Sequence, residues 1–581
     1  MAPLSPSVDE AKNAASTLLR QVYHRRPRSP RAKSIAFLAL SILFFLYIVS
    51  SSSRQPEPDY WTKFPSRHPF PERPEDAQVV LPPKSDISIN KALPHDLEKP
   101  NPYLHVLLSV PKTPFVPSQT RGVCRTLTSA MILGYPPPTL LGYGYENAHK
   151  TEYERTIDQV TRLRNYLKNS KTINDHDFVL VVDALDVFFQ LPPQILVERF
   201  QDILRTSNKK LQTKYGFAAV QNAPGAPAET VQKYSQRVLF GAILSAPDVY
   251  GWKTDHYHDG HLNRPRWLNP GTVIGQAADL IIIYDEVLRL IHQQQEKNSD
   301  YQALTQMFGR QEVVRELERR RTASWPVEMF FNLLGIGYAT NISGISVRLE
   351  TGHRYEYGIG VDYKSELFFN QIMAKGDVQW LKYSNVTKSE RLQMEMAVPR
   401  ESRLLLPDDI AALPGPFNQT RFAKELTTRP EWNATLDKLP NSDTHSWHTV
   451  PLMTNGHSAT IPVLAHLNGD PKVRDTWWGN MWFFPWARAL LRRYVRSAHG
   501  FDAAQSALLG GQDWWDMRGG RGGIWTDDET WISFSEICEG QERDLFDDDL
   551  GLWAKENGDP EEPVYNQFGN LIYGIEPKEG Q

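Results

Sequence analysis

The feature that most constrains the fold is a short run of apolar, β-forming residues that ends in acidic residues. Residues 178–182 read FVLVV, and such an unbroken run is typical of a strand buried on both faces. Further strands are expected at 103–110 and 139–142, and helices at 121–133 and 152–168. This alternation of strands and helices predicts an α/β domain with a mostly parallel sheet built from βαβ units.

Length, charge and cysteine content narrow the class of protein. The chain has 581 residues, of which 40% are hydrophobic, so it can bury a full α/β core and still carry further segments. A formal net charge of -4 provides no basic face for tracking nucleic acid, so nucleic acid is not expected as a partner. Cys124 and Cys538 cannot form a disulfide framework or a four-ligand zinc site, but they leave one bridge open.

The N-terminal region predicts a membrane anchor. Residues 34–53 are uncharged and can just span a bilayer core of about 30 Å. The basic residues before them favour a cytoplasmic N-terminus and a luminal remainder; they are Arg20, Arg25, Arg26, Arg28, Arg31 and Lys33. A cleaved signal peptide is the alternative, but its charged leader would be short, whereas 33 residues precede this apolar run. We therefore expect a single-pass type II protein of the endoplasmic reticulum or Golgi membrane.

The composition changes along the chain and predicts five parts. They are a basic cytoplasmic tail (1–33), a transmembrane anchor (34–53), a proline-rich stem (54–101), one globular domain (102–496) and a C-terminal tail (497–581). The stem is too rich in proline and charge to bury a core. The tail is rich in Gly, Asp, Glu and Trp, which indicates a loose structure whose tryptophans either pack back on the domain or meet a partner. Acceptor patterns for N-glycosylation, which agree with a luminal domain, occur at Asn341, Asn385, Asn418 and Asn433.

Asp183 and Asp186 follow the apolar run, at the end of a strand where α/β sheets bind ligands. If the strand continued through both, their side chains would point to opposite faces about 10 Å apart. They can share one ion only if the chain turns at Asp183. Hard cations such as Mn²⁺ or Mg²⁺ favour carboxylates, so the pair is a candidate metal site. The alternative is that one aspartate caps the next element and the other is solvated.

Two more segments place glycines and polar side chains beside apolar runs. In residues 266–288, Asn269 and Gly271 suggest backbone that approaches a ligand closely before a helix begins, although a purely structural turn would give the same pattern. In residues 462–484, a strand leads to His466. Imidazole is a common metal ligand, but a single histidine after a strand is often structural. The same glycine-rich loop carries Asn468, Gly469 and Lys472, a point charge suited to phosphate.

These segments, in this order, resemble the glycosyltransferase domain of the procollagen lysyl hydroxylase/glucosyltransferase family, which has a Rossmann-like GT-A fold. The resemblance runs over about 103–484 and is strong only at the motifs. Residues 183–186 (DALD) look like the family's metal-binding aspartate pair, WLNPGTVIG like its LNSGGFIG segment, and 466–469 (HLNG) like its HGNG motif. In addition, SDYQAL at 299–304 resembles its DDQLF segment, and DYKSELF at 362–368 its DHKSRIF segment.

The resemblance implies roles for individual residues. The Mn²⁺ (or Mg²⁺) ligands would be Asp183, Asp186 and His466, and the residues near the donor or its diphosphate would be Asn269, Gly271, Asn468, Gly469 and Lys472. Asp300 would lie by the transferred sugar and is the catalytic candidate. No general base is assigned, and Asp255, Asp259 and Glu328 stay open as further candidates beside Asp300. The iron-binding hydroxylase domain has no counterpart here, so lysine hydroxylation is not expected.

The expected function is therefore a metal-dependent glycosyltransferase that moves a hexose from a UDP-sugar to a glycan, protein or lipid acceptor, with a leaning towards retention of anomeric configuration. The chain departs from the family at Leu185, where the family has an aromatic, and at Tyr301, where it has a second acid. These departures motivate the alternative of a catalytically inactive sugar- or nucleotide-binding or scaffolding protein with the same fold. A metal-dependent phosphohydrolase is a third possibility, because paired aspartates and a histidine can also hold metals for attack by water.

Overall fold

The structure is a computed structural model. It describes residues 102–110, 117–143, 149–220, 229–243, 265, 267–294, 299–322, 353–372, 374–396, 398, 402–417, 433–496, 522–551, 564–565 and 571–573. The predicted cytoplasmic tail, anchor and stem (1–33, 34–53 and 54–101) lie outside these ranges, as do Asp255, Asp259 and Glu328. Within the ranges, every helix is too short or too polar to cross a membrane.

Eight strands form the main sheet, in the order β15-β14-β2-β1-β3-β8-β7-β9. Their bounds are β1 Leu104–Ser109, β2 Thr139–Leu141, β3 Phe178–Asp183, β7 Val238–Ile243, β8 Trp267–Gln276, β9 Ile359–Val361, β14 Gly523–Thr526 and β15 Trp531–Ser533. Neighbouring strands pair in parallel at β14–β2, β2–β1, β1–β3 and β7–β9, whereas β8 runs against both of its neighbours and β15 against β14. The prediction of an α/β domain with a mostly parallel sheet is confirmed.

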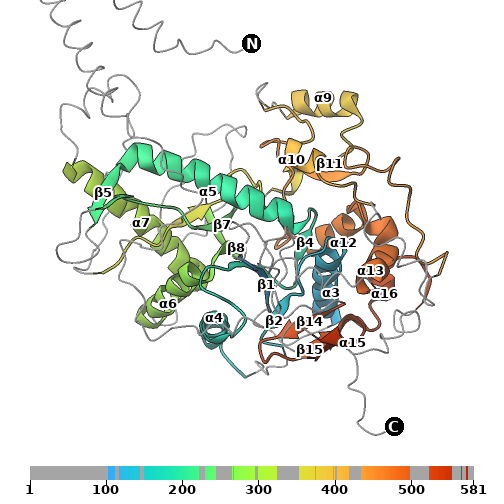
Figure 1. The fold of residues 1–581 in the computed structure, drawn as a ribbon, viewed down its shortest axis with the longest axis horizontal. Coiled ribbons are helices and arrows are strands. Elements are labelled where there is room, and N and C mark those ends of the chain that lie inside the picture. The colour runs from blue at the N-terminus through green and yellow to red at the C-terminus, as the bar shows by residue number, and fades with distance from the viewer. Residues whose placement is uncertain are drawn as a thin grey trace, which may run out of the picture. The chain divides into compact units, whose positions relative to one another are not determined.

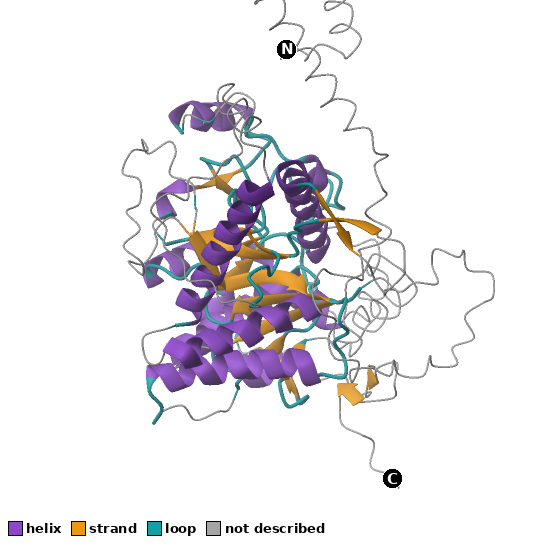
Figure 2. Cartoon of the chain, turned by 90° about the vertical axis from the view of Figure 1, so that its left-hand side faces the viewer, coloured by secondary structure: helices purple, strands orange, loops and turns teal. Residues whose placement is uncertain are grey.

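Helices cover both faces of this sheet (Figures 1 and 2). They are α3 Pro117–Ile132, α4 Glu152–Asn169, α5 Pro193–Tyr215, α6 Ala277–Gln294 and α7 Asp300–Thr322. Strand β3 alternates between the two sides: Leu180 and Val182 belong to the core under α3 and α5, whereas Val181 belongs to the core under α4 and α6. The apolar run FVLVV is therefore buried on both faces, as its composition predicts.

A second, three-stranded sheet adjoins the carboxyl end of β3. Its order is β10-β13-β4, from β10 Phe368–Asn370, β13 Leu464–His466 and β4 Val187–Phe189. Helix α12, Pro471–Asn480, packs on it through aromatic contacts: Trp478 lies 5.0 Å from Phe188 and Trp477 6.0 Å from Phe369, measured between ring centroids.

The remaining elements are short. The paired strands are β5 Phe217–Val220 with β6 Glu229–Gln232, β11 Val378–Leu381 with β12 Leu452–Asn455, and β16 Val564–Tyr565 with β17 Leu571–Tyr573. The helices are η3 Lys375–Asp377, α9 Val386–Glu395, α10 Asp408–Ala411, η4 Phe484–Trp486, α13 Ala487–Arg496, α15 Phe534–Cys538 and α16 Glu542–Phe546.

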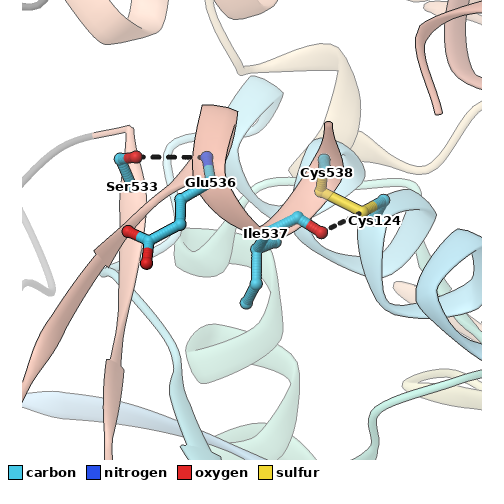
Figure 3. Close-up of a disulfide and its surroundings, with 5 residues drawn as sticks. All are labelled: Cys124, Ser533, Glu536, Ile537 and Cys538. Atoms are coloured by element: carbon cyan, nitrogen blue, oxygen red, sulfur yellow. Dashed lines mark hydrogen bonds between the residues drawn. A yellow bond between two sulfur atoms is a disulfide. The ribbon is translucent and has the colours of Figure 1, made fainter. Parts of the chain in front are cut away.

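Part of the predicted C-terminal tail belongs to the domain. Strand β14 pairs with β2, and β15 closes that side of the sheet. Trp525 is buried and its ring centroid lies 5.1 Å from that of Trp531. A disulfide joins Cys124 on α3 to Cys538 on α15 across 414 residues of sequence (Figure 3). Residues 522–551 are therefore not a loose tail: they pack back on the domain, which is one of the two alternatives that the sequence left open for the tryptophans.

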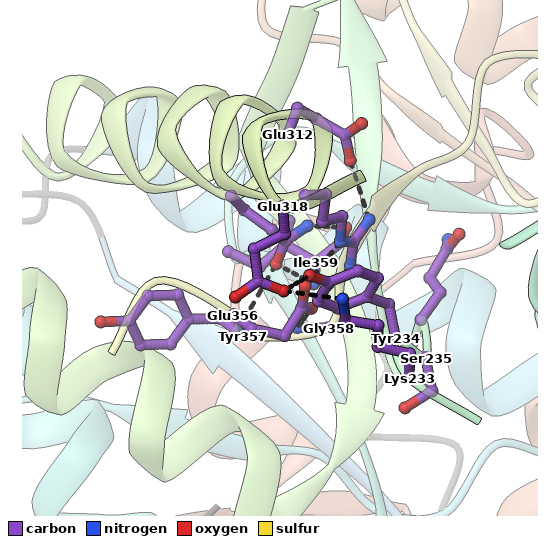
Figure 4. A network of polar contacts seen from close by, with 12 residues as sticks. Lys233, Tyr234, Ser235, Glu312, Glu318, Glu356, Tyr357, Gly358 and Ile359 are labelled. Carbon is purple, nitrogen blue, oxygen red and sulfur yellow. Dashed lines mark hydrogen bonds and ion pairs between the residues drawn. The ribbon is translucent and has the colours of Figure 1, made fainter. Parts of the chain in front are cut away.

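A polar network holds the C-terminal half of α7 (Figure 4). Arg315 donates to both carboxylate oxygens of Glu356, at 2.5 and 2.6 Å, and its side chain is only 3% exposed. Tyr234 donates its hydroxyl hydrogen to Glu318. Arg315 and Glu318 lie about 22 and 27 Å along α7 from Asp300, so the network anchors the end of the helix that is remote from Asp300.

Candidate metal centre

The chain turns at Asp183, as one shared ion would require. Strand β3 ends at this residue, residues 184–186 form a bend, and β4 begins at Val187. The bend is held locally, because the Asp183 carboxylate accepts the N–H of Leu185 at 3.4 Å and Ala184 donates its N–H to the carbonyl of Ser109 at 2.9 Å. The condition set by the sequence analysis for bringing both aspartates to one point is therefore met.

His466 reaches the same point from a distant part of the sequence. Strand β13 pairs with β4 so that His466 lies opposite Val187, and Leu467 donates its N–H to the carbonyl of Asp186 at 2.7 Å. The imidazole Nε2 lies 3.3 Å from Asp186 Oδ1. One ligand atom from each of Asp183, Asp186 and His466 lies within 4.8 Å of the other two, and no other such group of three is present in the described part of the chain.

Two buried atoms of this cluster lie 3.3 Å from each other, and neither has another hydrogen-bond partner. They are Oδ1 of Asp186 and Nε2 of His466. Buried polar atoms are nearly always hydrogen-bonded, and leaving one without a partner costs about 1–3 kcal/mol. A cation between these atoms would remove that cost, so the three side chains fit a divalent metal.

The charges within the cluster shift the pKa values of its members. Burial, and then the negative charge of Asp186, raise the pKa of Asp183 to about 7, while His466 acts in the opposite direction. For His466, burial alone would lower the pKa, but the charge of Asp186, a hydrogen bond to it and the charge of Asp183 together outweigh burial and raise the pKa. The metal-free cluster therefore retains protons that a bound cation would displace.

Strand β8 brings a glycine against the histidine. The pairing of β7 with β8 jumps from Phe240–Val273 to Gly241–Asn269, which leaves residues 270–272 of β8 as a bulge. Asn269, which directly precedes the bulge, accepts the N–H of Gly271 through Oδ1 at 2.7 Å. A Cβ on Gly271 would lie 2.2 Å from Cε1 of His466. The close approach that the sequence suggested is thus made to the metal-ligand candidate His466.

Asn370 was not singled out from the sequence. It is the last residue of β10 and lies opposite His466 in the parallel pairing with β13. Its side-chain nitrogen is 3.4 Å from His466 Nδ1, on the other side of the ring from Asp186. Such a neighbour fixes the orientation of an imidazole. The only sequence signal for Asn370 is its position directly after the apolar pair Phe368–Phe369.

The loop after His466 carries three of the residues predicted to face the donor. Asn468 has a buried side-chain oxygen without a hydrogen-bond partner. Gly469 donates its N–H to Gln371 Oε1 at 3.2 Å, and a Cβ there would lie 3.0 Å from the Gln371 side chain. Lys472 is exposed in the first turn of α12. Gly469 therefore has a packing role in the structure. Asn468 and Lys472 follow His466 closely in the sequence, and a contact of their polar side-chain groups with a donor stays a prediction.

Arg474 is a second residue that sequence reasoning missed. It is half-buried on α12, two residues after Lys472, and its positive charge lowers the pKa of both Asp183 and His466. It therefore lies within electrostatic range of the cluster. The sequence signal was the short spacing of two cations, Lys472 and Arg474, behind the histidine motif.

Two predicted acidic residues lie outside the cluster. Asp300 begins α7 and is close enough to Tyr284 for its charge, after the larger effect of burial, to raise the pKa of that tyrosine. Asp362, from the DYKSELF segment, accepts three backbone N–H groups, at 3.1 Å from Glu366, 2.8 Å from Leu367 and 3.0 Å from Phe368. Asp362 therefore shapes the loop before β10, whereas a contact of Asp300 with a sugar stays a prediction.

Comparison with known proteins adds no relative: neither the family models nor the curated proteins compared with this chain match it. The fold and the geometry define an α/β protein with a candidate divalent-metal centre outside the carboxyl end of a central strand, which is where open α/β sheets bind ligands.

Proposed function

We propose that this protein is a metal-dependent glycosyltransferase of the GT-A type, which transfers a hexose from a UDP-sugar to a glycan, protein or lipid acceptor. The observation that carries the proposal is the meeting of Asp183, Asp186 and His466, which are up to 283 residues apart in the sequence. Two of their buried ligand atoms have no hydrogen-bond partner outside the cluster. The mixed donor set favours Mn²⁺ over Mg²⁺, because Mg²⁺ prefers oxygen ligands alone.

The bound cation would act as a Lewis acid that neutralises charge on the departing diphosphate. Lys472 and Arg474, in the first turn of α12, would hold the same diphosphate, since both positive side chains and the amino end of a helix attract anions. Catalysis would rest on this positioning and charge neutralisation. Asp300 remains the candidate for contacting the sugar.

The proposed location is the lumen of the endoplasmic reticulum or Golgi, with residues 34–53 as a type II anchor. The disulfide between Cys124 and Cys538 supports an oxidising compartment, because disulfides are rare in proteins of the cytosol.

A second candidate is a nucleotide- or sugar-binding protein without turnover. Leu185 favours it, because this side chain is partly buried and packs against the hydrophobic core, so that stacking on a base would have to come from another residue. The metal centre would then serve binding alone.

The test is to incubate the full-length protein in detergent with Mn²⁺ and a panel of UDP- and GDP-sugars, and to measure released nucleotide. We expect slow hydrolysis of one donor, abolished in Asp183→Ala and unchanged in the exposed control Asp443→Ala. Binding of Mn²⁺ and nucleotide without release would support the binding protein. Cleavage of simple phosphate esters with nucleotide-sugars ignored would support a phosphohydrolase. Full activity in Asp183→Ala would contradict the metal assignment.

A further inference from the structure

Helix α3 lies directly against the bend that carries the two aspartates. A Cβ on Gly122 would lie 2.3 Å from the carbonyl oxygen of Leu185, 3.0 Å from its carbonyl carbon and 3.1 Å from its Cα. The obstacle is backbone and not a flexible side chain, so no rotamer change could make room for a methyl group. Leu185 stands between Asp183 and Asp186, and any displacement of its peptide group therefore moves a metal-ligand candidate.

The same helix supports the strand that follows the bend. Phe189 donates its N–H to Ser129 Oγ at 3.2 Å. At the carboxyl end of the helix, Tyr135 donates its hydroxyl hydrogen to the carbonyl of Leu191 at 2.9 Å. Helix α3 and residues 185–191 therefore form one packed unit.

The C-terminal segment is bonded covalently to α3. Cys124, two residues after Gly122, forms a disulfide with Cys538, and both cysteines are buried (Figure 3). Helix α15 is itself anchored, because Ser533, the last residue of β15, accepts the N–H of Glu536 at 3.2 Å. The disulfide thus ties α3 to an edge strand of the main sheet.

Ion pairs connect α3 to the histidine side of the site as well. Arg125 lies 2.6 Å from Asp475 on α12, and Arg121 lies 4.0 Å from the same carboxylate and 3.4 Å from Asp544 on α16. Helix α12 begins five residues after His466. Helix α3 therefore joins the segment with the carboxylates to the segment with the imidazole.

We propose that Gly122 and the Cys124–Cys538 disulfide are positioning elements of the metal centre, so that the affinity for Mn²⁺ depends on a bare α-carbon at position 122 and on a closed disulfide. This inference rests on the metal-binding part of the proposed function. Coordination tolerates only about 0.2 Å of ligand displacement, and residues that orient metal ligands typically change affinity by about 10- to 100-fold.

The first experiment measures Mn²⁺ binding by the full-length, metal-free protein with electron paramagnetic resonance, alongside circular dichroism. Gly122→Ala is compared with Gly479→Ala, a glycine on α12 with no atom within 4 Å of the added Cβ. We expect Gly122→Ala to lose at least about tenfold in Mn²⁺ affinity with a native spectrum, and Gly479→Ala to match the wild type. A folded Gly122→Ala protein with wild-type affinity would overturn the role of Gly122.

The second experiment needs no variant, and it tests the coupling between the disulfide and Mn²⁺ binding even if Gly122→Ala fails to fold. Coupling between two sites is reciprocal, so a closed disulfide that strengthens Mn²⁺ binding must itself be harder to reduce when Mn²⁺ is bound. In a redox titration of the wild type, a tenfold coupling appears as a shift of about 30 mV with saturating Mn²⁺. No shift in a protein that binds Mn²⁺ would overturn this inference and leave the proposed function standing. A wild type that does not bind Mn²⁺ would overturn both.

Discussion

The imidazole of His466 packs against the bare α-carbon of Gly271, so closely that a Cβ at that position would lie 2.2 Å from Cε1. We expect Gly271→Ala to rotate or displace the ring and to weaken Mn²⁺ binding by at least about tenfold, because ring orientation controls ligation. The control is Gly376→Ala, where the added Cβ has open space. Isothermal titration of both metal-free proteins checks this, and equal affinities would show that His466 is not a ligand.

Binding of Mn²⁺ should depend on pH. The pKa of Asp183 is raised to about 7 and that of His466 is also raised, so both groups hold protons at slightly acid pH. A cation requires the carboxylate and the neutral imidazole, and it must therefore displace these protons. We expect affinity to fall as the pH drops below about 7, with a slope that approaches about tenfold per pH unit for each displaced proton. Titrations at pH 6 and pH 7.5, each in two buffers of different ionisation enthalpy, would reveal the released protons; equal affinities at both pH values would contradict the prediction.

Asp362 should matter for stability and not for metal binding. Asp362→Ala leaves two buried and one half-buried backbone N–H groups without an acceptor, and we expect it to lower the free energy of unfolding by about 3 kcal/mol. Asp362→Asn keeps one acceptor oxygen and should lose less. Urea unfolding of the metal-free variants measures the difference. A folded Asp362→Asn protein with weakened Mn²⁺ binding would contradict the prediction that Asp362 acts on stability alone.

The sequence predicts local structure best, where the residues that form an element are neighbours in the chain. The continuous apolar run before Asp183 predicts a strand buried on both faces, because each of its residues needs an apolar neighbour. The turn at Asp183 could only be stated as a condition, since the same residues could continue the strand. The meeting of His466 with the aspartates came from a resemblance of motifs, because no local pattern reports pairing between β4 and β13.

The C-terminal residues 522–551 show where prediction from the sequence fails. Strands β14 and β15 have four and three residues, and runs this short are recognised only by their pairing, of β14 with β2 and of β15 with β14. The disulfide closes over 414 residues, a distance at which spacing carries no information. At Gly271 the structure shows a close contact with the His466 ring, whereas the predicted contact with the donor stays a prediction.

The two cations of α12 should bind the donor diphosphate. We expect Lys472→Ala and Arg474→Ala each to weaken UDP binding in the presence of Mn²⁺ by about 10- to 100-fold, since a hydrogen bond to a charged group contributes about 1.5–3 kcal/mol. Arg391→Ala on α9, which removes an exposed arginine paired with Glu395, should have no effect. Titration with UDP measures the change, and wild-type affinity in both α12 variants would place the diphosphate elsewhere.

Two of the four acceptor asparagines are exposed in the described residues, and a luminal domain should carry glycans on them. Asn385 and Asn433 both use Oδ1 to accept backbone N–H groups, at 3.1 Å from Lys388 and 2.9 Å from Thr435, and a glycan on the side-chain nitrogen leaves those bonds intact. Replacing Asn385 would also remove the cap of α9, so the better variants are Thr387→Ala and Thr435→Ala, which destroy each acceptor pattern and keep the asparagine. Expressed in a secretory cell, each variant should lose one step of the mobility shift seen on enzymatic deglycosylation. Unchanged mobility of the wild type on that treatment would count against a luminal domain.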